Sequence, residues 1–233
     1  AGVVAGQLAQ AGFTGPPAIL EGDRGLFAGA CPDPNPNAVL HDANAPWQIH
    51  SVSIKPWPSC RHTHPVIDAA LELATAIDIA SISEIDISTY QAAVDVCNRP
   101  TPSTPYEAKF SLQHTVAAAL SAGAIGFDSF ETESRNANAS LRAKTKIRSG
   151  EPYLSAYPES WGGEVSVTFN DGSTIAAARH QCKGDPEAAL DRDDMIAKSR
   201  ELLSFGGVSD VSNFIDSVLA MADGGPVKNP WIG

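Results

Sequence analysis

The sequence predicts an α+β domain inserted between helical segments. Two runs that alternate apolar and polar residues, joined by Asn170-Asp171-Gly172, predict a β-hairpin over residues 164–180. Helical spacing marks both ends of the chain, and strands and helices mix in the middle. We therefore expect residues 1–45 to hold a helical end segment and a linker, 46–184 the α+β domain, and 185–233 a return to helices.

The first part of the chain predicts a helix and then a break. Residues 2–12 are rich in small side chains and predict a helix that stops at Gly12. Gly15-Pro16-Pro17 breaks regular structure, and CPDPNPN at residues 31–37 is expected to be the linker into the α+β domain.

After the linker, apolar and polar residues alternate again. Residues 47–54 (WQIHSVSI) and 82–88 (ISEIDIS) predict two strands, the first of which delivers Lys55 at its end. Between them, Pro65 suits the first position of a helix. One apolar face of that helix is expected to comprise Val66, Ala70, Leu73 and Ile77.

The rest of the domain continues this mixed pattern. A short helix over 90–97 precedes a long helix over residues 106–122, which Gly123 ends, and a basic strand over 143–148. Beyond the hairpin, residues 187–204 and 208–222 have helical spacing.

Composition excludes several function classes. The chain has 233 residues and a formal net charge of -11, which argues against nucleic-acid and anionic-membrane partners. It contains no apolar run of the ~20 residues that span a bilayer. Four dispersed cysteines and no visible signal peptide predict reduced thiols and a cytoplasmic protein. The chain lacks an initiator Met, so we expect a fragment, a processed subunit or a start within the fold.

The stretch over residues 54–73 concentrates the chemistry. Lys55 and Arg61 lie just ahead of a predicted helix N-terminus, where unpaired N–H groups and the helix dipole favour an anion. Arg24 is the only other Lys or Arg in residues 1–61, so this positive charge is local. One interpretation is a site for an anionic ligand; the other is a basic loop that merely caps a core helix.

Four motifs resemble, in this order, the MmgE/PrpD family: GFTGP, KPWPSCRHTHPVIDAAL, KFSLQHTVAAAL and KGDPEAAL followed by MIAKSRELL. This family includes 2-methylcitrate dehydratases, cis-aconitate decarboxylases and iminodisuccinate epimerases. The resemblance covers essentially the whole chain. It implies an α+β lid inserted between segments of an all-helical domain, with the active site in the cleft between them.

The resemblance also implies that most of the helical domain, which precedes GFTGP in the family, is absent from this chain. A second chain would then supply the N-terminal helical half, and the assembly would form homodimers. The family's lyase chemistry needs neither a metal ion nor an organic cofactor.

Carried over to this sequence, the resemblance places Lys55 in the cleft as a catalytic residue, where it would pair with a substrate carboxylate or act as a general acid. Cys60, Arg61 and His62 are candidates for substrate binding. Cys60 stands where some relatives carry a histidine; a buried structural cysteine is the alternative. Cys60, His62 and His64 form a C-x-H-x-H pattern, but this spacing does not match a zinc finger.

A second group comes from the KFSLQHTV segment. His114 stands where the decarboxylases have a tyrosine, so it is a catalytic candidate for positioning substrate or transferring a proton. Ser111 is a candidate for substrate binding, and a buried, satisfied histidine is the alternative at 114. Asp185 is expected to cap the helix that follows it. Lys144, Lys146 and Arg148 are expected to form a solvated strand face.

These observations predict a metal-independent hydro-lyase of small di- or tricarboxylates that abstracts a proton α to a carboxylate and eliminates water. Epimerisation and decarboxylation are the alternatives within the family. The alternative of another class is a non-catalytic subunit that binds an anionic metabolite or scaffolds another chain.

Overall fold

The computed structural model describes residues 1–35 and 45–226. The backbone divides into two compact units, residues 1–50 and 51–233. The first unit contains α1 (Gly2–Gln10) and α2 (Leu26–Ala30), neither of which buries a residue. The predicted helix therefore forms, and Gly12 follows it with φ +85°. Of the predicted linker over 31–37, residues 36 and 37 lie outside the described residues.

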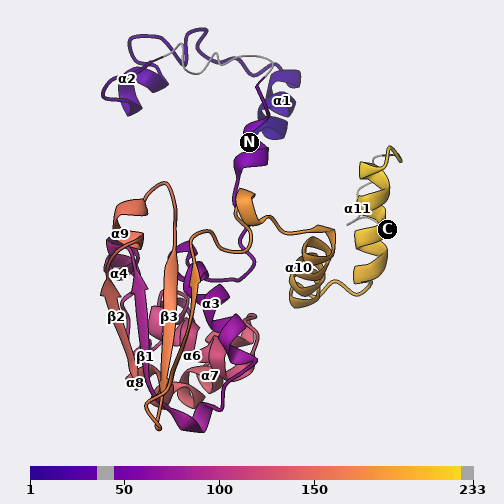
Figure 1. Cartoon of the computed structure of the whole chain (residues 1–233). Helices are drawn as coiled ribbons and strands as arrows, with labels where there is room; N and C mark the ends of the chain where they lie inside the picture. The colour runs from indigo at the N-terminus through magenta and orange to yellow at the C-terminus, as the bar shows by residue number, and fades with distance from the viewer. Residues whose placement is uncertain (36–44, 227–233) are drawn as a thin grey trace. The chain divides into compact units, whose positions relative to one another are not determined.

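The second unit is built on one mixed sheet, drawn in Figure 1. Its order is β2-β1-β3-β4. The strands are β1 (Ile82–Thr89), β2 (Thr145–Ser149), β3 (Gly163–Phe169) and β4 (Thr174–Arg179). β1 pairs in parallel with β2 and antiparallel with β3, and β3 and β4 form the predicted hairpin. The prediction of an α+β domain is confirmed.

Helices cover one face of this sheet. α3 (His64–Ala74) packs on β3, β4 and α6 (Leu112–Ala122), and α6 also contacts β2. Ile85 and Ile87 of β1 lie opposite Val167 and Val165 of β3, and all four side chains are buried beneath the helices. The intervening strand residues are polar, as expected for a sheet with one covered face.

The parallel β1–β2 pair requires a long crossover, because a tight turn can join only antiparallel strands. Residues 90–144 provide it, and most of the short helices of the unit lie there or just after β2. These are α4 (Gln91–Cys97), α5 (Pro105–Ala108), α7 (Thr132–Ala137), α8 (Ala139–Ala143) and α9 (Tyr153–Ala156). Short 3-10 turns η4 (Ile79–Ser81) and η5 (Asp128–Phe130) complete the connections.

Two predicted elements are wrong. Residues 47–54 do not form a strand: a 3-10 turn, η2 (Gln48–Ser51), opens the segment, and the rest finds no strand partner. The single long helix over 106–122 is two helices, α5 and α6. Ser111 separates them because its hydroxyl accepts a hydrogen bond from the His114 N–H at 3.0 Å and starts a new helix.

Other expectations hold in part. Val66, Ala70 and Leu73 form the buried face of α3, but the helix ends at Ala74, so Ile77 packs on the core from outside it. Gly123 ends α6 in the left-handed conformation, with φ +64°.

The chain returns to helices, as predicted, after the turn η6 (Pro186–Ala188). α10 (Arg192–Phe205) begins with a capping box between Asp191 and Asp194, and α11 (Val211–Ala222) packs against it. Within the described parts of the chain, no helix is both long and apolar enough to cross a bilayer.

Candidate active site

The segment that carries Lys55 is held against a turn from the other end of the domain. The Ile54 N–H donates to the Gly184 carbonyl at 2.8 Å. Gly184 has φ +97°, and a Cβ there would lie 2.1 Å from the Ile54 carbonyl oxygen. Only glycine allows this approach, so the KGD turn fixes the backbone immediately before Lys55.

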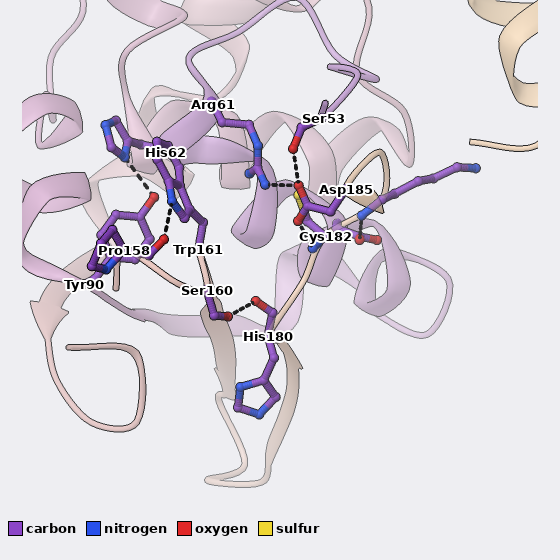
Figure 2. A network of polar contacts seen from close by, with 12 residues as sticks. Ser53, Arg61, His62, Tyr90, Pro158, Ser160, Trp161, His180, Cys182 and Asp185 are labelled. Atoms are coloured by element: carbon purple, nitrogen blue, oxygen red, sulfur yellow. Dashed lines mark hydrogen bonds and ion pairs between the residues drawn. The ribbon is translucent and has the colours of Figure 1, made fainter. Parts of the chain in front are cut away.

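Asp185 joins the same two segments through its side chain, as Figure 2 shows. Its carboxylate accepts hydrogen bonds from the Ser53 hydroxyl at 3.0 Å and from the Cys182 N–H at 2.9 Å, and it forms an ion pair with Arg61. The prediction that Asp185 caps the next helix is wrong, because its side chain makes no capping bond to η6. The carboxylate instead compensates a nearby buried cation, which is a stronger interaction.

Arg61 therefore does not stand free as an anion receptor. Its side chain is 17% exposed, one amino group pairs with Asp185, and the guanidinium lies 5.4 Å from the centre of the Trp161 ring. A 3-10 turn, η3 (Arg61–Thr63), precedes α3, and the first residues of α3 are buried. The helix N-terminus expected to receive an anion is thus covered.

His62 and Trp161 form an aromatic wall next to Arg61 (Figure 2). The two rings stack at 4.8 Å and 6°, and His62 Nδ1 lies 2.8 Å from the Tyr90 hydroxyl. Burial, and secondarily the charge of Arg61, lowers the pKa of His62 from its ordinary value. The imidazole is therefore mostly neutral at physiological pH.

Lys55 and Arg61 line one cavity of about 430 Å³, together with Trp161 and Asp185. Lys55 is exposed, and its ammonium donates to the Ser59 carbonyl at 3.3 Å. Among the described residues no carboxylate lies within ion-pairing distance of Lys55, whereas Arg61 is neutralised by Asp185. Two acidic side chains, Glu159 and Glu187, also line the cavity, so its charge is mixed and the uncompensated cation is local.

Ser111 and His114 lie elsewhere, fully buried at the start of α6. Ser111 donates to the Arg99 carbonyl at 2.6 Å while it caps the helix. His114 Nε2 donates to the Ser129 carbonyl at 2.7 Å, which leaves Nδ1 as the acceptor facing Arg142 at 3.4 Å. Burial lowers the pKa of His114 to about 4. Neither Ser111 nor His114 is among the described residues that line the Lys55 cavity. Their predicted roles in substrate binding and catalysis stay predictions.

Cys60 lies just before η3, and it is half-buried. A hydrogen bond from the Cys97 thiol lowers its pKa to about 6, with a backbone hydrogen bond at His62 and the charge of Lys55 acting in the same direction against the effect of burial. His64 is fully buried, and burial lowers its pKa to about 3. Residues 1–35 and 45–226 contain no group of three or more His, Cys, Asp or Glu side chains arranged to hold a metal ion.

The lysines and arginine expected to form a solvated strand face behave differently from one another. Lys146 is exposed and pairs with Glu84, and Arg148 is exposed. Lys144 precedes β2, and its ammonium donates to the Ile82 carbonyl.

Sequence reasoning missed the residues that hold this site together. The sequence predicts only a helix cap for Asp185, and it singles out neither Gly184 nor Trp161 as part of a site. Their sequence distance from Lys55 hides the contact: Ser53 and Asp185 are 132 positions apart. The only available signal was the pairing of a glycine with an acidic residue in a turn, which is common.

Comparison with known proteins agrees with the fold. A family model for the MmgE/PrpD C-terminal domain matches residues 57–222. The cis-aconitate decarboxylase of Mus musculus is similar to this chain, with 26% identity over 213 residues, which cover 85% of this chain and 42% of that protein. The chain thus spans less than half the length of this curated relative. Because the family model covers well over half of the sequence and includes the sheet, α3, α6, Arg61 and Asp185, the chain belongs to the MmgE/PrpD family.

Proposed function

We propose that this chain is the carboxylate-binding part of an enzyme that removes water from a small di- or tricarboxylate. The observation that carries the proposal is Lys55: a lysine on a cavity of about 430 Å³, without a carboxylate partner among the described residues and bonded only to a neutral carbonyl. Family membership supports a lyase-type reaction. The volume suits a small molecule, and the free ammonium suits an anionic group.

The chemistry follows from that charge. A base abstracts the proton α to a substrate carboxylate, and negative charge spreads onto the carboxylate oxygens. An ammonium placed at those oxygens binds the more highly charged transition state more strongly than the substrate, and so lowers the barrier. The electron pair then forms a C=C bond as the C–O bond to the β-hydroxyl breaks, and the departing hydroxide takes up a proton to leave as water.

In this proposal the base does not come from the Lys55 cavity. Arg61 is a guanidinium cation that cannot accept a proton, and His62, which is hydrogen-bonded to Tyr90, is not among the described residues that line the cavity. We propose that the base lies on a helical half supplied by a second chain, with the assembly forming homodimers.

Decarboxylation is the second candidate, and the similarity to the decarboxylase of Mus musculus favours it. His114, which stands where the resemblance implies a tyrosine in decarboxylases, argues for dehydration instead. The two reactions differ in their products: dehydration releases water, and decarboxylation releases carbon dioxide. Epimerisation would exchange the α proton with solvent and release neither.

The test uses the chain with whatever polypeptides co-purify with it. Di- and tricarboxylates are incubated in D₂O and followed by NMR for deuterium uptake, alkene signals and carbon dioxide. Removal of the Lys55 charge in K55A should lower turnover by about 100-fold or more, which is typical for loss of one group that stabilises developing charge. Because Lys55 is exposed, the thermal unfolding midpoint should not change.

K146A is the matched control, since Lys146 is an exposed lysine paired with Glu84 at the sheet edge. It should retain full activity. Turnover of K55A within threefold of the wild type would disprove the role of Lys55. Binding of a carboxylate without any turnover or exchange would favour a non-catalytic subunit.

A further inference from the structure

Lys55 also lines a second, smaller cavity, of about 180 Å³. The walls of this cavity are largely apolar, with Trp57, Phe127 and Leu202 among them, and they carry a second lysine, Lys198 of α10. Water takes up roughly 30 Å³ per molecule, so the space holds about six waters, which suits one carboxylate-bearing arm of a small acid. Of the described residues that line the smaller and the larger cavity, Lys55 alone is common to both.

Two contacts hold α10 against the smaller cavity. Near the start of the helix, Asp194 pairs with Lys183 at 2.6 Å. The phenyl ring of the last helical residue stacks on Phe127, with the ring centres 4.0 Å apart. Lys198 lies one helical turn after Asp194, so the two side chains project from the same side of α10. Because Lys183 belongs to the turn that fixes the backbone before Lys55, one turn helps to place both cavity lysines.

Lys198 is a half-buried cation without a counter-ion. It makes no ion pair with a described residue, whereas the neighbouring Lys183 does. Glu201, an acidic side chain of the same cavity, directs its carboxylate to the backbone at Gly126, where a Cβ would lie 3.0 Å from Glu201 Oε1. Two lysines against one carboxylate among the described lining residues give the cavity a net positive charge, and its apolar walls strengthen the attraction for an anion.

We propose that Lys198 binds a second carboxylate of the substrate in the smaller cavity and so restricts the enzyme to acids with two or more carboxylates. This assignment rests on the proposed dehydration, in which Lys55, shared by the two cavities, stabilises charge at the reacting end of the molecule. The distal carboxylate does not react, so Lys198 binds it equally in the substrate and in the transition state. Such uniform binding lowers KM and leaves kcat unchanged. A monocarboxylate leaves the Lys198 ammonium without a partner.

Binding of tricarballylate, a tricarboxylate with no hydroxyl to eliminate, tests the assignment without turnover. NMR titration of the chain, with whatever polypeptides co-purify, compares tricarballylate with the monocarboxylate butyrate. K198M should weaken tricarballylate binding about 10-fold or more, which is typical for loss of a charged hydrogen-bond partner, and should leave butyrate binding unchanged. K198R keeps the charge and should retain most of the affinity. R200M is the matched control, because Arg200 is exposed on the same helix and is not among the residues that line the cavity.

Two further readouts separate Lys198 from Lys55. On whichever di- or tricarboxylate is turned over, K198M should raise KM about 10-fold with kcat unchanged, whereas K55A lowers kcat. Acetylation of the wild type with acetic anhydride, mapped by mass spectrometry, requires no variant. Tricarballylate should protect Lys198 from acetylation, and butyrate should not. Lys146, which is exposed at the sheet edge, should react equally in the presence of either acid.

Three results would overturn the assignment: unchanged tricarballylate affinity in K198M, an equal loss of affinity in R200M, and no protection of Lys198 in the wild type. Should K198M not fold, the acetylation of the wild type decides alone. Loss of turnover in K55A with normal tricarballylate binding in K198M would remove the Lys198 subsite and keep the dehydration. Tricarballylate binding that depends on Lys198, without turnover of any carboxylate, would keep the subsite and remove the dehydration.

Discussion

Acid should destabilise this protein through His64. The ring is fully buried, burial lowers its pKa to about 3, and the backbone at Ser59 offsets this only in part. In the unfolded chain the pKa is about 6.5, so between these values the unfolded state binds a proton that the native state does not. The native state is therefore favoured most above pH 6.5, and this contribution is lost as the pH falls towards 3.

The size of the effect follows from the gap between the two states. At pH 5 the loss is about 1.4 kcal/mol for each of the 1.5 pH units below 6.5, or about 2 kcal/mol. His114, whose pKa burial and, to a lesser degree, the charge of Arg142 lower to about 4, adds a similar amount. We expect the free energy of unfolding to fall by about 4 kcal/mol from pH 7.5 to pH 5 through these two rings.

Urea unfolding followed by circular dichroism at pH 7.5, 6.5, 5.5 and 5.0 measures this dependence. H64L replaces the buried ring with an apolar side chain, so only His114 still contributes to the pH dependence. The free energy of unfolding of H64L should therefore fall by about 2 kcal/mol less than that of the wild type between pH 7.5 and pH 5. H180N, which removes an exposed imidazole, is the control and should follow the wild type. Parallel curves for wild type and H64L over this range would refute the reasoning.

Further predictions concern the network around Lys55, and urea unfolding tests all of them. D185A leaves the mostly buried Arg61 without its partner and should lower the free energy of unfolding by about 3 kcal/mol. E84A breaks an exposed pair and should leave the free energy of unfolding unchanged. Equal losses of stability in the two variants would contradict the argument from burial. G184A and G123A both force alanine into a positive φ, but only Gly184 faces a backbone oxygen at 2.1 Å, while Gly123 faces open space. We expect G123A to lower the free energy of unfolding by about 1 kcal/mol and G184A by at least twice that. The reverse order would show that contact with the backbone oxygen does not determine the loss of stability.

Local signals were enough to predict most of the elements. The hairpin follows from Asn170-Asp171-Gly172, where Gly172 has φ +83°, and the end of α6 follows from Gly123. Both are fixed by the conformations open to one or two residues, so no distant contact can change them. The spacing of apolar residues after residue 186 likewise predicts the C-terminal helices. α10 begins with a capping box formed by the nearby residues Asp191 and Asp194.

Non-local contacts account for the failures. Alternation over residues 47–54 is typical of a strand, yet a strand needs a partner, and the segment pairs with the Gly184 turn through one backbone hydrogen bond. Arg61 looked like part of an open anion site because its partner lies 124 positions away. The cap at Ser111 competes with continuation of the helix, and spacing alone cannot reveal which of the two is more stable.

The bond between Ser53 and Asp185 spans almost the whole α+β unit. Contacts that are this far apart in sequence are slow to form, since a large loop must close first. During synthesis, the stretch bearing Lys55 leaves the ribosome long before the residues that fix it. A nascent chain can thus assemble its central strands early, but the lysine acquires its final surroundings only when translation has passed the aspartate.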